Sequence, residues 1–203
     1  LVGVSLGLFG GGGSTLTLPI LMYVLGMDEK TAIASSLLMV GLISAVAAVP
    51  HFYRGNVDLR RGLGFASAGA IGAFLGGRVA EWIPSAIQIY GFLGMMLATS
   101  IAMIRGRRET EKKQSTPALW KSGLLGGGVG FITGLVGAGG GFVIVPALSL
   151  VGGLAMPQAI GTSLLVITIN ALSGYVGHAA HVQINGPQIA LLSSAASLGA
   201  IIG

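Results

Sequence analysis

The amino-acid sequence predicts an all-α, polytopic membrane protein built from two repeats of four transmembrane helices. Three observations lead to this prediction: the composition, a series of long apolar segments, and a glycine-rich phrase that occurs twice. Hydrophobic residues make up 53% of the chain and charged residues only 8%, whereas a soluble domain carries about 25% charged residues. So few charges cannot cover a surface in water, and the lipid bilayer is therefore the expected environment.

Seven segments are apolar enough to cross a bilayer, for which a helix needs about 20 mostly apolar residues. Glycines interrupt the first and the fifth, and the seventh stops at Gly203, so an eighth segment is expected beyond it. The predicted segments are 1–25, 31–50, 62–82, 86–104, 118–152, 158–177 and 187–203.

Two loops, at 51–62 and 105–121, hold most of the basic residues. Two predicted spans separate them, so both loops lie on the same side of the membrane. The positive-inside rule makes that side cytoplasmic, and the cell inner membrane is the expected location. The net charge of +5 is thus explained by membrane topology, and nucleic acid is not an expected partner.

The phrase GLFGGGGSTLTLPI at 7–20 returns as GLVGAGGGFVIVPA at 134–147. Sliding the sequence by 127 positions gives 16 identities in 56 ungapped pairs, among them a pair of prolines and a pair of histidines. A biased composition raises the number of chance matches, but it does not easily align glycines, proline and histidine in one register. The chain is therefore interpreted as a duplication.

The predicted units are repeat 1 at 1–104, a cytoplasmic linker at 105–117, and repeat 2 at 118–203, which lacks its last helix. Because four spans is an even number, both repeats are expected to have the same orientation. They are then related by an axis along the membrane normal.

The glycine runs predict a break in the first helix of each repeat. A continuous helix from Gly123 to Gly152 measures about 45 Å, which exceeds the roughly 30 Å of the hydrocarbon core. An interrupted helix and a re-entrant hairpin both resolve this mismatch, and the sequence does not choose between them. Backbone that leaves a helix inside the membrane must be covered by protein or line a wet cavity.

A half-helix that starts after such a break presents unpaired N–H groups and the positive end of its dipole. Glycine lets an anion approach this backbone closely, so we predict that the two half-helices together hold one small anion. Close helix packing is the alternative role for glycine, and it is favoured for Gly126, Gly130 and Gly134. The predicted binding residues are Gly10, Gly11, Gly12, Gly13, Ser14 and Thr15, then Gly137, Gly139, Gly140, Gly141 and Phe142, with Ser36, Ser163 and Asn170 from the second helix of each repeat.

His51 and His178 end the second helix of each repeat, at the face predicted to be cytoplasmic. The helix dipole favours histidine at this position. Imidazole also titrates near neutral pH, so both are candidate proton carriers if transport is coupled. Asp58 is predicted to form a salt bridge with the neighbouring arginines. We find no cluster of ligands that predicts a metal or another cofactor, and no nucleophile–base pair that predicts an enzyme.

The paired glycine phrases, the loop HFYRGNVDLRRG and the duplicated four-helix unit resemble the sulfite exporter TauE/SafE family. This resemblance covers essentially the whole chain. It implies an integral membrane transporter that exports a small sulfur-containing anion, such as sulfite or an organosulfonate. An anion channel of the same fold and a non-transporting membrane scaffold are the alternatives. The expected partners are the anion, the lipid bilayer and, as a possible homodimer, a second copy of the chain.

Overall fold

The computed structural model describes residues 14, 16–106, 119–137, 140–179 and 186–202. This part of the chain is helical and holds no strand, which confirms the all-α prediction. Its elements are α2 (Thr17–Pro19), the π-helical turn η2 (Ile20–Val24), α3 (Glu29–Tyr53), α4 (Leu59–Val79), the 3₁₀ turn η3 (Ala80–Trp82), α5 (Ser85–Gly106), α6 (Leu119–Val136), α7 (Gly141–Pro146), the π-helical turn η4 (Ala147–Val151), α8 (Met156–His178) and α9 (Gly186–Ile202).

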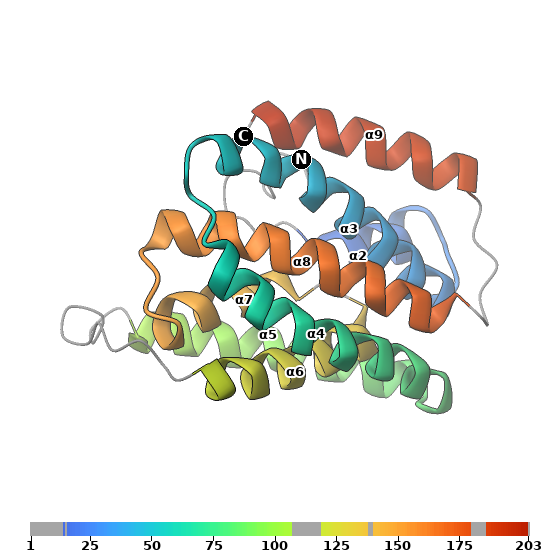
Figure 1. The fold of residues 1–203 in the computed structure, drawn as a ribbon. Coiled ribbons are helices and arrows are strands. Elements are labelled where there is room, and N and C mark those ends of the chain that lie inside the picture. Colours follow the sequence, from blue (N-terminus) through green and yellow to red (C-terminus); the bar gives the residue numbers. More distant parts are fainter. Residues whose placement is uncertain (1–13, 15, 107–118, 138–139, 180–185, 203) are drawn as a thin grey trace.

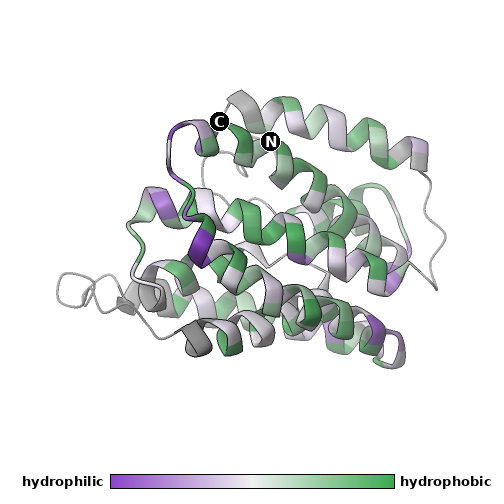
Figure 2. Cartoon of the chain, in the orientation of Figure 1, coloured by the Kyte–Doolittle hydropathy of each residue, from purple (hydrophilic) through white to green (hydrophobic). Residues whose placement is uncertain are grey.

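Three helical segments among the described residues are long and apolar enough to cross a membrane: Glu29–Tyr53, Leu59–Trp82 and Met156–His178. The apolar parts of α5, α6 and α9 are shorter. Figure 2 shows that the hydrophilic residues gather near the ends of the helices, while the lengths between them are apolar or neutral. This distribution fits a bundle whose sides face lipid and whose ends face water.

Contacts between glycines and their neighbours define the directions of the helices. α4 and α8 are parallel, because Gly62 lies against Thr162 near their N-termini and Gly77 lies against Gly174 near their C-termini. Figure 1 shows the two helices side by side along most of their lengths. We call the end where α4 and α8 begin the Arg61 end, after a residue in the first turn of α4.

α3 runs antiparallel to α8. His51, near the C-terminus of α3, lies against Gly161 in the first turns of α8, and Gly41 lies against Leu172. α3 therefore begins where α4 and α8 end, and we call this the Lys30 end. Figure 1 shows α3 starting at the right of the view, where α8 stops.

α4 and α6 pack backbone to backbone, through small residues spaced four apart. Gly126 lies on the carbonyl group of Phe65, and Gly130 lies on that of Gly69. One turn further on, Gly134 meets Ala73 in the same way. The packing role predicted for this glycine ladder is confirmed. Because the paired residue numbers rise together, α6 is parallel to α4 and begins at the Arg61 end.

The predicted segment 118–152 forms a re-entrant hairpin. α6 stops at Val136, and the chain turns through Gly137 and Gly140, which have φ values of +79° and +68°. α7 and η4 then return to the Arg61 end, where the carbonyl group of Gly152 accepts a hydrogen bond from the guanidinium group of Arg61 (3.0 Å). The predicted break is present, and the structure selects the hairpin from the two forms that the sequence allowed.

The hairpin shows that the predicted parallel orientation of the two repeats is wrong. At the offset of 127 residues α3 corresponds to α8, yet these helices are antiparallel. Between the starts of α3 and α8 the chain crosses the bundle with α3, α4 and α5, while the hairpin returns to the end from which it came. An odd number of crossings inverts the second repeat, so the axis that relates the repeats lies in the membrane plane.

The offset itself recurs in the local backbone. Pro19 and Pro146 are each followed by a π-helical turn, and these turns lead to Gly26 and Gly153, with φ values of +64° and +65°. The boundaries assigned to the two repeats remain a prediction.

The same inversion separates the two histidines. His51 lies at the Arg61 end and His178 at the Lys30 end, so the prediction that both lie at one face is wrong. The two basic loops do lie on one side, because the start of α6 is at the Arg61 end; residues 107–118 of the second loop are outside the described residues. That this end faces the cytoplasm remains a prediction.

Candidate functional site

The turn between α6 and α7 requires glycine at two positions. A Cβ atom on Gly137 would collide with the side chain of Ile33, in the first turns of α3. A Cβ atom on Gly140 would collide with Thr133 of α6. Both residues also have positive φ, which other residues adopt only with strain. The break is therefore a built feature, and it brings the tip of the hairpin against the start of α3.

Ser36 connects α3 to the hairpin. Its hydroxyl group is fully buried and donates toward two carbonyl groups, those of Ile33 (2.8 Å) and Gly137. Ser163, at the equivalent position of α8, donates to Ile160 (2.7 Å). Ser36 thus holds the turn in place, and the substrate contacts predicted for both serines remain predictions.

The start of α7 lies in the protein interior. The carbonyl group of Gly140 accepts hydrogen bonds from the N–H groups of Val143 (2.9 Å) and Ile144 (3.0 Å). Gly141 is buried, and the ring of Phe142 meets that of Phe92 edge to face at 5.8 Å. The N–H groups predicted to bind an anion therefore begin a buried half-helix.

The first-repeat half of the predicted site cannot be placed in the same way. Gly10–Gly13 and Thr15 lie outside the described residues, as does Gly139 of the second repeat. Ser14 is described and is fully buried.

Asn170 is a buried amide in the middle of α8. It is 1% exposed, and neither its oxygen nor its nitrogen has a hydrogen-bond partner among the described residues. The amide lies on Gly69 of α4, where a Cβ atom would come within 2.6 Å of it. The flanking residues Ile167 and Ala171 pack in one cluster with Ile144 of α7. An unpaired buried amide costs about 1–3 kcal/mol, so this position is unfavourable for stability alone.

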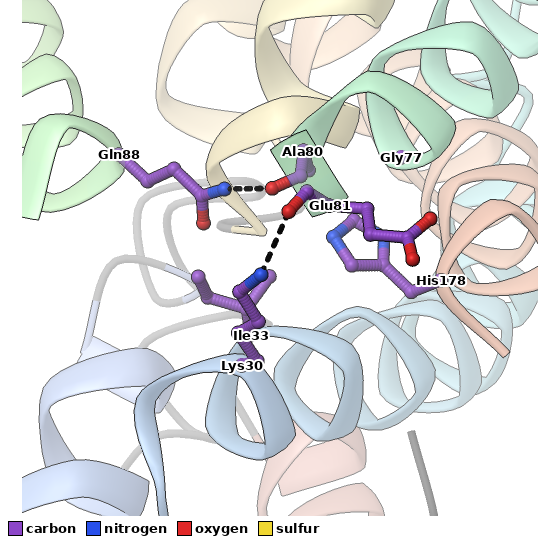
Figure 3. A pocket seen from close by; sticks show the side chains of 7 residues that line it. All are labelled: Lys30, Ile33, Gly77, Ala80, Glu81, Gln88 and His178. Atoms are coloured by element: carbon purple, nitrogen blue, oxygen red, sulfur yellow. Dashed lines mark hydrogen bonds between the residues drawn. The ribbon is translucent and has the colours of Figure 1, made fainter. Parts of the chain in front are cut away.

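A pocket of about 160 Å³ opens at the Lys30 end (Figure 3). Its lining comes from α3, the end of α4, η3, the start of α5 and the end of α8. Ile33 belongs to this lining and also touches Gly137, so the pocket adjoins the tip of the hairpin. The lining residues are Lys30, Ile33, Gly77, Ala80, Glu81, Gln88 and His178.

Comparison with known proteins assigns the chain to a family. A family profile described as Sulfite exporter TauE/SafE matches residues 1–203. The chain belongs to the sulfite exporter TauE/SafE family. It is 33% identical over 190 residues to a protein of Xylella fastidiosa strain Temecula1 named "Probable membrane transporter protein", covering 91% of this chain and 73% of that protein.

A second relative of this TauE/SafE chain is the "Probable membrane transporter protein YdhB" of Bacillus subtilis strain 168. The two are 27% identical over 183 residues, which cover 88% of this chain and 75% of the relative. No solved structure gives a significant match. The protein is therefore a membrane transporter by family, as the sequence motifs predicted.

At the Arg61 end of the TauE/SafE chain, Asp58 and Arg61 fasten three elements together. Asp58 caps α4 by accepting the N–H of Arg61 (3.0 Å), and its carboxylate lies 3.5 Å from the guanidinium Nε, as the predicted salt bridge requires. Its own N–H donates to the hydroxyl group of Thr162 in α8 (2.9 Å). Since Arg61 also reaches Gly152, one acid–base pair joins α4, α8 and the end of the hairpin.

Sequence reasoning missed Lys30 and Gln88 as site residues of this TauE/SafE chain. Gln88 lies near the start of an apolar segment and is only 2% exposed. A polar amide within an apolar span was the available signal. Lys30 carries no such signal, because one basic residue beside a span is ordinary.

Proposed function

We propose that this TauE/SafE protein exports a small anion, sulfite or an organosulfonate, across the cell inner membrane by alternating access. The inverted orientation of α3 and α8 supports alternation, because inverted repeats let one half of a transporter rock against the other around a central site. The sulfur chemistry and the direction of transport are taken from the family description.

The observation that carries the proposed site is the unpaired, buried amide of Asn170. An amide nitrogen can donate to an oxyanion without bringing a full charge into the membrane. The N–H groups at the start of α7, around Gly141 and Phe142, add donors at the positive end of a half-helix. Gly10–Gly13, Ser14 and Thr15 complete the proposed site from the first repeat.

This arrangement favours a transporter over the two alternatives. A scaffold does not need an unpaired amide in its core, and replacing Asn170 by an apolar residue of similar shape would make a scaffold more stable. A channel requires a continuous water-filled path, whereas α6 and α4 are in direct backbone contact through Gly126, Gly130 and Gly134. Saturable uptake against a gradient in liposomes separates a transporter from a channel.

Asn170→Leu tests the site, because leucine keeps the approximate shape of asparagine and removes both polar groups. We expect the purified variant to be at least as thermally stable as the wild type, since it buries no unpaired amide. In liposomes loaded with sulfite, it should lose most of its counterflow. Ser173→Ala is the matched control on the same helix, because Ser173 already donates to the carbonyl group of Ala70 (2.7 Å) and acts in packing.

Transport at the wild-type rate by Asn170→Leu, at equal protein per liposome, contradicts the proposed site. Loss of transport in both variants to the same degree points to a packing effect instead. Running the assay with sulfite, sulfate, taurine, sulfoacetate and phosphate then identifies the substrate. If none of these anions is transported, the proposed function is wrong.

A further inference from the structure

The pocket at the Lys30 end contains two buried polar groups that are only partly used. Gln88 donates from its amide nitrogen to the carbonyl groups of Ala80 (2.6 Å) and Ile83 (3.3 Å), but its oxygen has no partner within the described ranges. His178 is 7% exposed, and its Nε2 atom likewise has no partner there. Figure 3 shows these two side chains on opposite sides of the pocket, with Lys30 between them.

The hydrogen bond of His178 determines the state of its ring. Nδ1 lies 3.0 Å from the carbonyl oxygen of Gly174, and a carbonyl can only accept, so Nδ1 carries a proton. In the neutral imidazole Nε2 is then an acceptor, and a proton added at Nε2 converts it into a donor. Gly77 makes this geometry possible, because a Cβ atom there would lie 2.9 Å from Nδ1.

The charged groups of the pocket balance each other while His178 is neutral. Lys30 supplies one positive charge, and its ammonium group donates to the carbonyl group of Glu81 (2.8 Å). The Glu81 side chain, at the exposed mouth, supplies one negative charge. Among the other described charged residues near this end, Arg78 is exposed and its guanidinium group lies over the ring of Phe74 at 6.0 Å. α5 contributes only the uncharged Gln88 to the lining.

We propose that this pocket binds one small oxyanion together with one proton. The anion is held by the ammonium group of Lys30 and by Nε2 of His178, which becomes a donor on taking up the proton. An anion alone would leave an uncompensated negative charge in a largely apolar setting, and the proton restores the balance. The inference takes from the proposed function only that the ligand is a small anion.

The size and position of the pocket suit this role. Its volume of about 160 Å³ equals the share of about five water molecules at roughly 30 Å³ each, so the ligand must be small. Ile33 forms both its wall and the support of Gly137, so the pocket is a vestibule at the tip of the hairpin. It lies at the opposite end from the two basic loops.

Isothermal titration calorimetry with methanesulfonate tests the proposal. This anion stays ionised across the neutral range, so any proton taken up must go to the protein. Titration of Asn170→Leu in two buffers of different ionisation enthalpy reports the pocket without the central site. We expect uptake of about one proton for each anion bound, and binding that weakens up to about tenfold for each unit of rising pH.

Two substitutions assign the groups. Lys30→Met should abolish binding, whereas Arg60→Met, an equal charge change at the exposed Arg61 end, should leave it intact. His178→Gln should retain weaker binding but lose both the proton uptake and the pH dependence. Thermal stability measured on each variant distinguishes these effects from misfolding.

Binding without proton uptake overturns the inference, as does wild-type binding by Lys30→Met or the absence of any binding. These outcomes are independent of the proposed function. Transport by Asn170→Leu at the wild-type rate would remove the central site and leave the pocket result unchanged. A pocket that binds no anion would leave the transport result unchanged.

Discussion

Replacing Gly130 by alanine tests whether direct backbone contact holds α4 and α6 together. A Cβ atom at this position would lie 2.7 Å from the Cα atom of Gly69 and closer still to its carbonyl oxygen. Backbone cannot rotate away as a side chain can. The helices must therefore separate by roughly 0.7 Å or more to reach an ordinary contact of about 3.4 Å.

The cost of this separation follows from the length of the interface. A gap of about 0.5–1 Å forfeits about a quarter to a half of the dispersion energy of each contact, and the ladder runs over Gly126, Gly130 and Gly134. Overpacking of this kind costs about 1–3 kcal/mol. For a chain of this length each kcal/mol lowers the melting temperature by about 2–4 °C, so we expect a fall of roughly 2–12 °C.

The assay is the fraction of purified protein that stays monodisperse in detergent after heating. Gly128→Ala is the matched control, because it lies on the same helix and a Cβ atom there would meet nothing within 4 Å. Alanine favours a helix over glycine by about 0.5–1 kcal/mol, so this control should melt at the wild-type temperature or slightly above it. Equal melting temperatures for the two variants would refute the argument from backbone contact.

Three further predictions concern the turn, the α4 cap and the topology. Ser36→Ala should destabilise the protein by about 1–3 kcal/mol because the buried carbonyl group of Gly137 loses its partner, while Ser44→Ala should be neutral since that buried hydroxyl group has no partner among the described residues; equal melting temperatures would contradict this. Asp58→Ala should cost about 1 kcal/mol through loss of the helix cap, measured by the same melting assay, and a stability equal to that of Asp58→Asn would count against the cap. The chain has no cysteine, so single cysteines report topology: in intact cells one at Asn56 should resist a membrane-impermeant thiol reagent and one at Trp82 should react, and the reverse pattern would overturn the orientation.

Local features of the fold could be predicted from the sequence because their causes are local. The predicted span 62–82 is observed as Leu59–Trp82, and 158–177 as Met156–His178, since apolar length alone defines a helix that can cross a membrane. The break at Gly137 and Gly140 could also be predicted, because glycine is costly inside a helix unless the backbone needs it.

The candidate site could be predicted only in part. Asn170 was found because a polar amide within an apolar span is a signal in itself. The pocket was not found, because Lys30, Gln88 and His178 come from three helices that are distant in sequence. Nothing in any one of these segments indicates that their side chains face one cavity.

The sequence by itself determined that the chain is a helical membrane protein with a duplicated unit, a broken helix and two basic loops on one side. Tertiary structure alone decided the direction in which the chain continues after the break. That direction depends on contacts between distant segments, the hydroxyl group of Ser36 on Gly137 and the guanidinium group of Arg61 on Gly152. Because the hairpin does not cross the bundle, these contacts also invert the second repeat and place His51 and His178 at opposite ends.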